Sequence, residues 1–322
     1  MNRIRERWLS GPARPTLEQL EDRFVPSIDY PNLPLVVAQF GSSGVWEWIG
    51  NTWAQITASK ATVVAASSQY FHQYDQFASY SSIIVCEFPG WGVWSFHEAT
   101  NSWTHLTWAD ASLLAVSPQY GSVAAEIPGQ GVWEYNFNGT GQWTQLTAAN
   151  ASLLAMNSSG SQTVAAEFPG GGVWTFEGGW HQLTAADASS LSIAQDRTVL
   201  AEFPGQGVWY HNPNTGWANH HITSNDAAIV SLSENVDEAA AYFPQANGAI
   251  SSPGLWVNPL NGQGWQYLFT AAECTLMGIA GRGSYTVAEF PTYGVWMFYN
   301  NHWIQLTGAD ASVLAVDTGI QI

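Results

Sequence analysis

The sequence is poor in charged residues and poorer still in positive ones. Only 10% of its 322 residues are charged, and eight lysines and arginines stand against 25 acids. Five arginines lie in residues 1–27, so residues 28–322 contain three basic and 21 acidic residues, a net charge of −18. A surface of that sign repels phosphate, which argues against nucleic-acid binding and against attraction to anionic membranes.

Cysteine, long apolar runs and catalytic motifs are also scarce. Cys86 and Cys274 are too few for a disulfide framework. No run of 18 apolar residues is present, so no membrane insertion is expected. The sequence has no His-Glu-x-x-His helix, Gly-x-Ser-x-Gly elbow or phosphate loop. We therefore expect no catalytic residues, no cofactor and no metal, and a role that is non-enzymatic.

Tryptophan is abundant, with 18 residues, and its spacing reveals an internal repeat. A Gly-(Val/Leu)-Trp triplet occurs seven times, with spacings of 35–48 residues between successive tryptophans. A second tryptophan follows each triplet after 6–10 residues. The first series is Trp46, Trp94, Trp133, Trp174, Trp209, Trp256 and Trp296. Such a period is typical of one four-stranded propeller blade.

The third copy, residues 112–147, shows four strand signals. Apolar runs at 112–116 and 122–127 are followed by the turn 128–131, the run 132–135, and a last run at 143–147. Short runs rich in Val, Trp and Thr between Pro, Gly and Asn clusters predict a meander, whose strands we name A to D.

The two ends of the repeat region predict a closed ring. The chain enters at a strand B, residues 36–40, and ends at a strand A, residues 312–316. We expect the last strand to complete the first blade, because closure protects the open sheet edges. The sequence therefore predicts an all-β, seven-bladed β-propeller over residues 28–322, in which the C-terminal strand A closes the ring.

The Gly-Val-Trp and Trp-x-Gln-Leu-Thr units resemble the tryptophan-rich repeats of bacterial propeller proteins. The predicted architecture is similar to that of propeller lectins of the tachylectin and fucose-lectin kind. The resemblance covers about nine-tenths of the chain, and it implies a carbohydrate-binding function.

Residues 1–27 contain five arginines and three prolines but no apolar stretch of secretory length. Residues 14–27 resemble the short N-terminal motif of exported proteins from planctomycete-type bacteria. That resemblance implies a secreted or cell-surface location; the alternative is a disordered basic tail.

The two tryptophan series differ in their neighbours. In the first, five copies carry another aromatic two residues later, on the same sheet face, which favours inter-blade core. In the second, an amide or ring follows two residues later, a combination that suits a sugar pocket. The predicted ligand-binding pairs are Trp53 with Gln55, Trp103 with His105, Trp143 with Gln145, Trp180 with Gln182, Trp217 with Asn219, Trp265 with Tyr267, and Trp303 with Gln305. The alternative is that these rings dock under the adjacent blade.

Acids recur at two positions of the repeat. Strand B carries a glutamate before its turn, and the D-to-A connector carries an aspartate; the residues are Glu87, Glu126, Glu167, Glu202 and Glu289, and Asp110, Asp187, Asp226 and Asp310. Both positions fall on one face of the disc. They predict either attraction of Ca²⁺ or a cationic partner, or hydrogen bonds that hold the turns.

Two irregular loops are further candidates for ligand specificity, because specificity tends to lie in loops on a rigid scaffold. They are the aromatic A–B loop at 67–82 and the B–C connection at 245–253.

The function we infer is glycan or surface-polysaccharide binding at repeated rim sites. The second hypothesis for the function is a protein-interaction scaffold, in which the tryptophans are purely structural. A glycan hydrolase is the third, since the acidic face offers carboxylate pairs.

Overall fold

The structure is a computed structural model, and it describes residues 34–49, 51–71, 79–117, 121–137, 141–157, 163–217, 220–248, 250–269, 273–280 and 285–316. The predicted N-terminal segment, 1–27, therefore lies outside the described residues. So do residues 72–78, the centre of the A–B loop predicted at 67–82. The two flanks of that predicted loop are not loop but the ends of strands that run over Val63–Phe71 and Ser79–Phe88.

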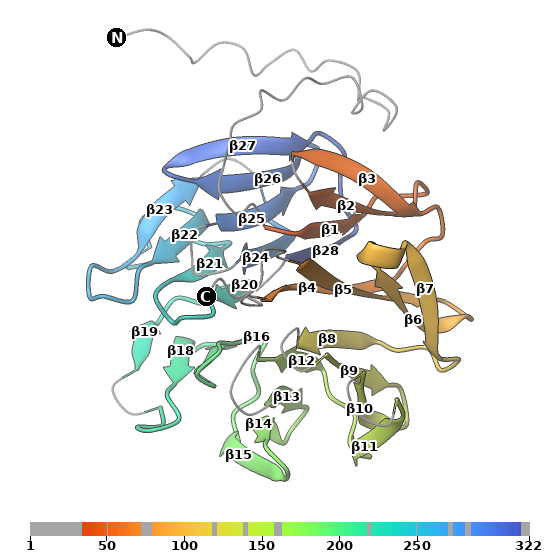
Figure 1. Cartoon of the computed structure of the whole chain (residues 1–322). Coiled ribbons are helices and arrows are strands. Elements are labelled where there is room, and N and C mark those ends of the chain that lie inside the picture. The colour runs from red at the N-terminus through yellow and green to blue at the C-terminus, as the bar shows by residue number, and fades with distance from the viewer. Residues whose placement is uncertain are drawn as a thin grey trace, which may run out of the picture.

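The described chain forms seven four-stranded antiparallel sheets, the blades (Figure 1). Blade 1 contains β28 (Val313–Val316), β1 (Val36–Gln39), β2 (Val45–Ile49) and β3 (Thr52–Thr57). Blade 2 contains β4 (Val63–Phe71), β5 (Ser79–Phe88), β6 (Gly92–His97) and β7 (Ser102–Thr107), with a 3₁₀ helix at Glu98–Thr100. Blade 3 contains β8 (Leu113–Ser117), β9 (Ser122–Ile127), β10 (Gly131–Asn136) and β11 (Trp143–Thr147).

Blade 4 contains β12 (Leu153–Met156), β13 (Val164–Phe168), β14 (Gly172–Phe176) and β15 (Trp180–Thr184). Blade 5 contains β16 (Ser190–Ile193), β17 (Val199–Phe203), β18 (Gly207–His211) and β19 (His221–Thr223). Blade 6 contains β20 (Ile229–Leu232), β21 (Ala239–Phe243), β22 (Gly254–Asn258) and β23 (Gln266–Phe269). Blade 7 contains β24 (Leu276–Ala280), β25 (Tyr285–Phe290), β26 (Gly294–Tyr299) and β27 (His302–Thr307).

The seven-bladed propeller is confirmed, and so is its closure. The strands A surround the axis, each in contact with the next from β28 through β24, and the strands D form the outer rim (Figure 1). The closing strand β28 pairs antiparallel with β1, with Val316 opposite Val36 and Val313 opposite Gln39. A buried cluster that includes Val36, Trp48 and Met297 joins blade 1 to blade 7.

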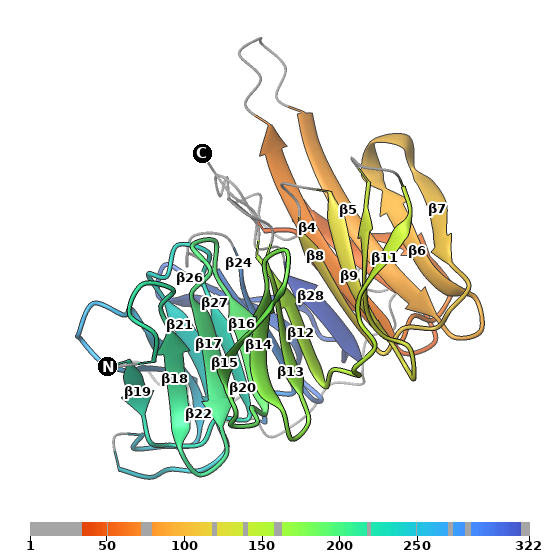
Figure 2. The same cartoon turned by 90° about the horizontal axis from the view of Figure 1, so that it is seen from below.

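Figure 2 shows the disc from the side, with the long hairpin of β4 and β5 projecting from one face. On that face lie the A–B and C–D loops, and on the other lie the B–C turns and the D–A connectors. We call them the A–B face and the B–C face. No helix in the described part of the chain is long and apolar enough to cross a membrane.

A glycine is required where the B–C turn meets strand C in six of the seven blades. Gly131 has φ +80°, and a Cβ there would lie 2.2 Å from the carbonyl oxygen of Thr147. Backbone of strand D thus passes directly over the turn, which leaves no space for a side chain. The same close contact recurs in six blades, at Gly44, Gly92, Gly131, Gly172, Gly207 and Gly294.

The blades bury their cysteines. The thiols of Cys86 and Cys274 are both buried and unbonded to each other, in blades 2 and 7. Burial raises the pKa of both thiols, and that of Cys274 reaches about 12. Neither side chain is therefore expected to react as a thiolate at neutral pH.

Candidate ligand-binding surface

The strand-D tryptophans are half-buried and connect neighbouring blades. The indole Nε1 of Trp180 donates to the carbonyl oxygen of Leu146, in strand D of the preceding blade, at 3.0 Å. The same bond, at 3.0–3.2 Å, joins Trp53 to Leu306, Trp143 to Leu106, Trp217 to Leu183 and Trp303 to Leu268. The bond from Trp53 crosses the closure between blades 1 and 7.

A β-bulge makes each of these carbonyls available. In blade 3, Val132 pairs with Thr147 and Trp133 with Gln145, so Leu146 has no partner across the ladder. An unpaired residue of this kind is what a bulge creates. The shift recurs at the same place in all seven blades. In five blades the strand-D carbonyl at this place accepts the indole of the next blade. The buried Nε1 of Trp265 has no such bond.

Two aromatic neighbours contact the same rings. Trp180 lies edge-on to Phe168 at 5.1 Å between ring centroids and tilted against Phe176 at 5.4 Å. Trp103 has the same two contacts, with Phe88 and Phe96. Much of each strand-D ring is thus committed to packing.

The strand-D glutamines lie beside a different tryptophan, the one in strand C. Gln145 is paired across the sheet with Trp133, and both donate to the carbonyl oxygen of Gln130 in the B–C turn, at 2.8 and 3.1 Å. The equivalent pairs are Gln55 with Trp46, Gln182 with Trp174, and Gln305 with Trp296. Gln55, Gln145 and Gln182 are exposed, and these four strand-C rings are half-buried.

Three blades replace the glutamine with a ring. His105 is tilted against Trp94 at 4.6 Å between ring centroids, and Tyr267 lies edge-on to Trp256 at 4.8 Å. In blade 5 the ring opposite Trp209 is His221, at 4.3 Å. There Trp217 precedes β19 instead of lying in it, and Asn219 lies outside the described residues.

The strand-B glutamates are buried and bonded inside their own blades. Glu167 accepts a hydrogen bond from the hydroxyl of Ser152, just before strand A. The equivalent bonds are from Thr62 to Glu87, Ser112 to Glu126, Ser189 to Glu202, and Thr275 to Glu289. In blade 1, Gln39 takes the place of the acid and accepts from the backbone N–H of Ala61 at 2.9 Å.

The connector aspartates hold the B–C turns. Asp187 accepts the backbone N–H groups of Gly170 and Gly172 at 3.0 and 3.2 Å. Asp110 does the same for Gly90 and Gly92. Asp226 accepts from Gly205, Asp310 from Thr292, and Asn150 from Gly129. Sequence had predicted turn-holding hydrogen bonds as one of two roles for these acids, and this is the role that the contacts support.

Burial raises the pKa of Glu167 from 4.5 to about 7, and the adjacent carboxylate of Asp187 adds to the rise. The same two causes, in the same order, raise the pKa of Glu87 and of Glu202 to about 7, beside Asp110 and Asp226. Near neutral pH this face is therefore less negative than its count of acids. No group of three or more potential metal ligands exists among the described residues.

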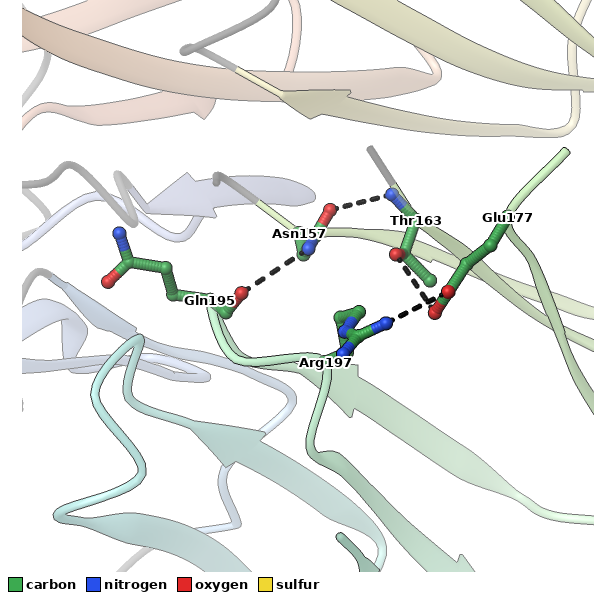
Figure 3. Close-up of polar contacts among 5 residues, drawn as sticks. All are labelled: Asn157, Thr163, Glu177, Gln195 and Arg197. Atoms are coloured by element: carbon green, nitrogen blue, oxygen red, sulfur yellow. Dashed lines mark hydrogen bonds and ion pairs between the residues drawn. The ribbon is translucent and has the colours of Figure 1, made fainter. Parts of the chain in front are cut away.

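The opposite face carries a polar network between blades 4 and 5 (Figure 3). The guanidinium of Arg197 donates to the carboxylate of Glu177 at 2.9 Å. Asn157 accepts the backbone N–H of Thr163 at 2.8 Å and donates to the carbonyl of Gln195 at 3.4 Å. The groups of this network come from two A–B hairpins and one C–D loop, so the network connects blade 4 to blade 5.

Comparison with solved structures finds many similar folds. A computationally designed protein, Ika8, aligns with a TM-score of 0.53 at 12% identity, over 88% of this chain and 87% of that one. The β-propeller domain of Cps50 (Swd1) from Myceliophteria thermophila aligns with a TM-score of 0.53 at 10% identity, over 72% and 86%. A chain of a mitotic checkpoint complex aligns with a TM-score of 0.56 at 11% identity, over 93% of this chain and 99% of that one. These likenesses show the propeller fold alone.

Neither the protein-family models nor the curated protein sequences contain a match to this chain. Because the fold hosts many functions, it is consistent with ligand binding or with a protein-interaction scaffold. A more specific function has to be argued from the side chains of this chain.

Sequence reasoning missed two features of this surface. It paired each glutamine with the tryptophan two residues before it, whereas the cross-strand tryptophan is the ring held with it at the turn. It also did not identify His221, because blade 5 has extra residues between Trp217 and strand D. Alignment of the copies on their Thr ends, Thr147 with Thr223, would have found it.

Proposed function

We propose that this chain is a non-enzymatic, carbohydrate-binding propeller that works in the extracellular space or at the cell surface. One observation carries the ligand class: in four blades, a glutamine side chain is fixed beside the ring of a strand-C tryptophan at the B–C turn. An aromatic wall with a few oriented polar groups is the usual chemistry of a sugar site. The arrangement at Gln145 and Trp133 is the clearest copy.

The repetition adds to this argument. A weak site that is presented several times on one rigid ring gains avidity for a polysaccharide without any new contact. The strand-D tryptophans, Trp53 to Trp303 in the series above, belong to the proposal as the supports behind these sites. Their packing sets the position of strand D and therefore of each glutamine.

The test is binding of the full chain to an array of neutral oligosaccharides, followed by titration of the best probe. The variant replaces Gln55, Gln145, Gln182 and Gln305 with alanine together. The control replaces Thr104 and Thr144, exposed residues on the other face of strand D. We expect the glutamine variant to lose at least about tenfold in affinity, by loss of avidity and of hydrogen bonds, and the control to bind as the wild type. A wild-type chain that binds no glycan contradicts the proposal.

The location is tested separately. Fusion of residues 1–27 to a secreted reporter in a planctomycete host should release the reporter from the cytoplasm. Retention would contradict the extracellular part of the proposal.

A further inference from the structure

Blade 2 departs from the repeat at three positions. Trp91 lies in the B–C turn, at the residue whose carbonyl accepts the strand-C indole; the other blades have Ser43, Gln130, Gly171, Gln206, Ser252 and Tyr293 there. Trp108 follows the threonine that ends strand D, where the other described copies have Ala58, Ala148, Ala185, Ser224 and Gly308. His105 replaces the glutamine, as His221 does in blade 5 and Tyr267 in blade 6. Blade 2 alone carries an aromatic ring at all three positions.

The three departures lie together on the B–C face. The backbone of Gly92, next to Trp91, is so close to Trp108 that a Cβ there would lie 2.8 Å from the Cα of Trp108. The ring of Trp108 lies 4.0 Å from that of His105 and 6.4 Å from that of Trp94. We call Trp91, Trp94, His105 and Trp108 the blade-2 aromatic patch.

The patch is exposed in a way that folding does not explain. Trp91 is 64% exposed and Trp108 is 67% exposed, the two highest values among the large hydrophobic residues that the structure describes. Alanine, serine or glycine at the Trp108 position suffices to build the same turn in other blades. An exposed aromatic cluster on an otherwise regular ring indicates an interaction surface.

Charge narrows the class of ligand. Asp110, two residues after Trp108, is bonded to the backbone of Gly90 and Gly92 on either side of Trp91. Residues 28–322 carry only three basic groups against 21 acids. Indole faces attract cations, and they do so more strongly where the surroundings are negative.

The hydrogen bonds of the patch favour a cation over a sugar. The carboxylate of Asp110 already accepts the backbone N–H groups of Gly90 and Gly92, and the indole of Trp94 already donates to the carbonyl of Trp91. His105 lies opposite Trp94 in place of the glutamine, so the patch lacks the amide oxygen and amino group that each proposed glycan site presents to a hydroxyl. Ring faces and negative charge remain, and these are what a guanidinium or ammonium group requires.

We propose that the blade-2 aromatic patch, with Asp110, binds arginine or lysine side chains of a basic polypeptide segment from a partner protein. Further aspartates recur around the same face in blades 4, 5 and 7, at Asp187, Asp226 and Asp310. Charge spread in this way fits successive basic residues on an extended segment better than one small amine. This site is separate from the proposed glycan sites, and its ligand is of a different class.

The experiment is a fluorescence-anisotropy titration of the full chain with a labelled Arg-Gly repeat peptide of eight residues. A Glu-Gly peptide of the same length and maltohexaose are the comparison probes. The first variant combines Trp91→Gln and Trp108→Ala, each the residue that blade 3 carries at that position, so the turn should still form. We expect it to bind the Arg-Gly peptide about tenfold or more weakly than the wild type.

A second pair of variants tests the charge. Asp110→Asn should keep the turn bond, because Asn150 makes it in blade 3, and should weaken peptide binding about threefold at low salt. Asp187→Asn makes the same change in blade 4, which has Gly171 and Ala185 in place of the two tryptophans. We expect it to change the affinity for the peptide less than twofold.

Two outcomes would overturn the proposal. One is a Trp91→Gln, Trp108→Ala variant that binds the Arg-Gly peptide as the wild type does. The other is a wild type that binds maltohexaose through these tryptophans but not the peptide, which would make the patch a sugar platform.

Discussion

Two glycines of one turn, Gly129 and Gly131, should differ sharply in their tolerance of alanine. Both have left-handed backbones, with φ of +75° and +80°. Alanine therefore costs about 1 kcal/mol at either position from backbone strain alone. The surroundings differ: a Cβ at Gly129 has no atom within 4 Å, whereas one at Gly131 would lie 2.2 Å from Thr147 O and 2.6 Å from Ala148 C.

That second contact must be relieved by moving backbone. Overpacking that forces a backbone shift costs about 1–3 kcal/mol. Added to the strain, this predicts a loss of about 2–4 kcal/mol for Gly131→Ala against about 1 kcal/mol for Gly129→Ala. The displaced segment follows Leu146, whose carbonyl accepts the indole of Trp180 in the next blade, so the damage should extend across the blade interface.

The assay is equilibrium unfolding in urea, followed by tryptophan fluorescence and circular dichroism. The two variants share a turn, a substitution and a sign of φ, so the difference between them isolates the close contact. Equal unfolding free energies for the two variants would refute the reasoning, because strain would then be the whole effect.

Three further predictions concern single side chains. Trp180→Phe removes the donor to Leu146 and should cost about 1–2 kcal/mol in urea unfolding, whereas Trp108→Phe, at an exposed ring, should stay within about 0.5 kcal/mol; equal losses would contradict an inter-blade role for the indole. Stability should rise as pH falls from about 7 toward 4.5, because the folded chain keeps protons on strand-B glutamates of pKa about 7 that the unfolded chain releases. Glu167→Gln should reduce this slope in thermal melts, and an unchanged slope would contradict it. Arg197→Met removes an exposed ion pair and should cost less than about 1 kcal/mol; a larger loss in the same urea assay would show that the network of Figure 3 is more than a surface contact.

The architecture could be predicted from the sequence because its signals are local and repeated. A Pro-Gly turn before Val132-Trp133 ends one strand and begins the next, and the same signal occurs in other copies. The pairing of the last strand A with the first strand B followed from counting strand types, although the two strands lie at opposite ends of the repeat region; the structure adds the register, with Val316 opposite Val36. Closure of a ring needs no long-range sequence signal beyond that count.

The partner of each glutamine could not be predicted in this way. Period-two spacing places Trp143 and Gln145 on one face of strand D, which is correct, but it does not show which neighbouring blade or strand covers each ring. The bulge at Leu146 decides this, because it turns that carbonyl toward the indole of the next blade. Nothing in one sequence marks a bulge when every residue in the strand is an ordinary strand former.

Repetition and departure from repetition carry different information in this chain. A residue that recurs in most blades, such as the strand-D tryptophan, must satisfy the packing that every blade shares, and its ring is accordingly fixed between aromatic neighbours. A residue that only one blade carries, such as Trp108, is free of that requirement, and the other blades fold without it. Glycan binding at the recurring glutamines should therefore weaken stepwise as copies are removed, whereas binding of a basic peptide should disappear with the two tryptophans of blade 2. The two dependences can be measured on the same set of variants, and a peptide affinity that followed the number of intact glutamines would place the basic ligand on the repeated surface instead.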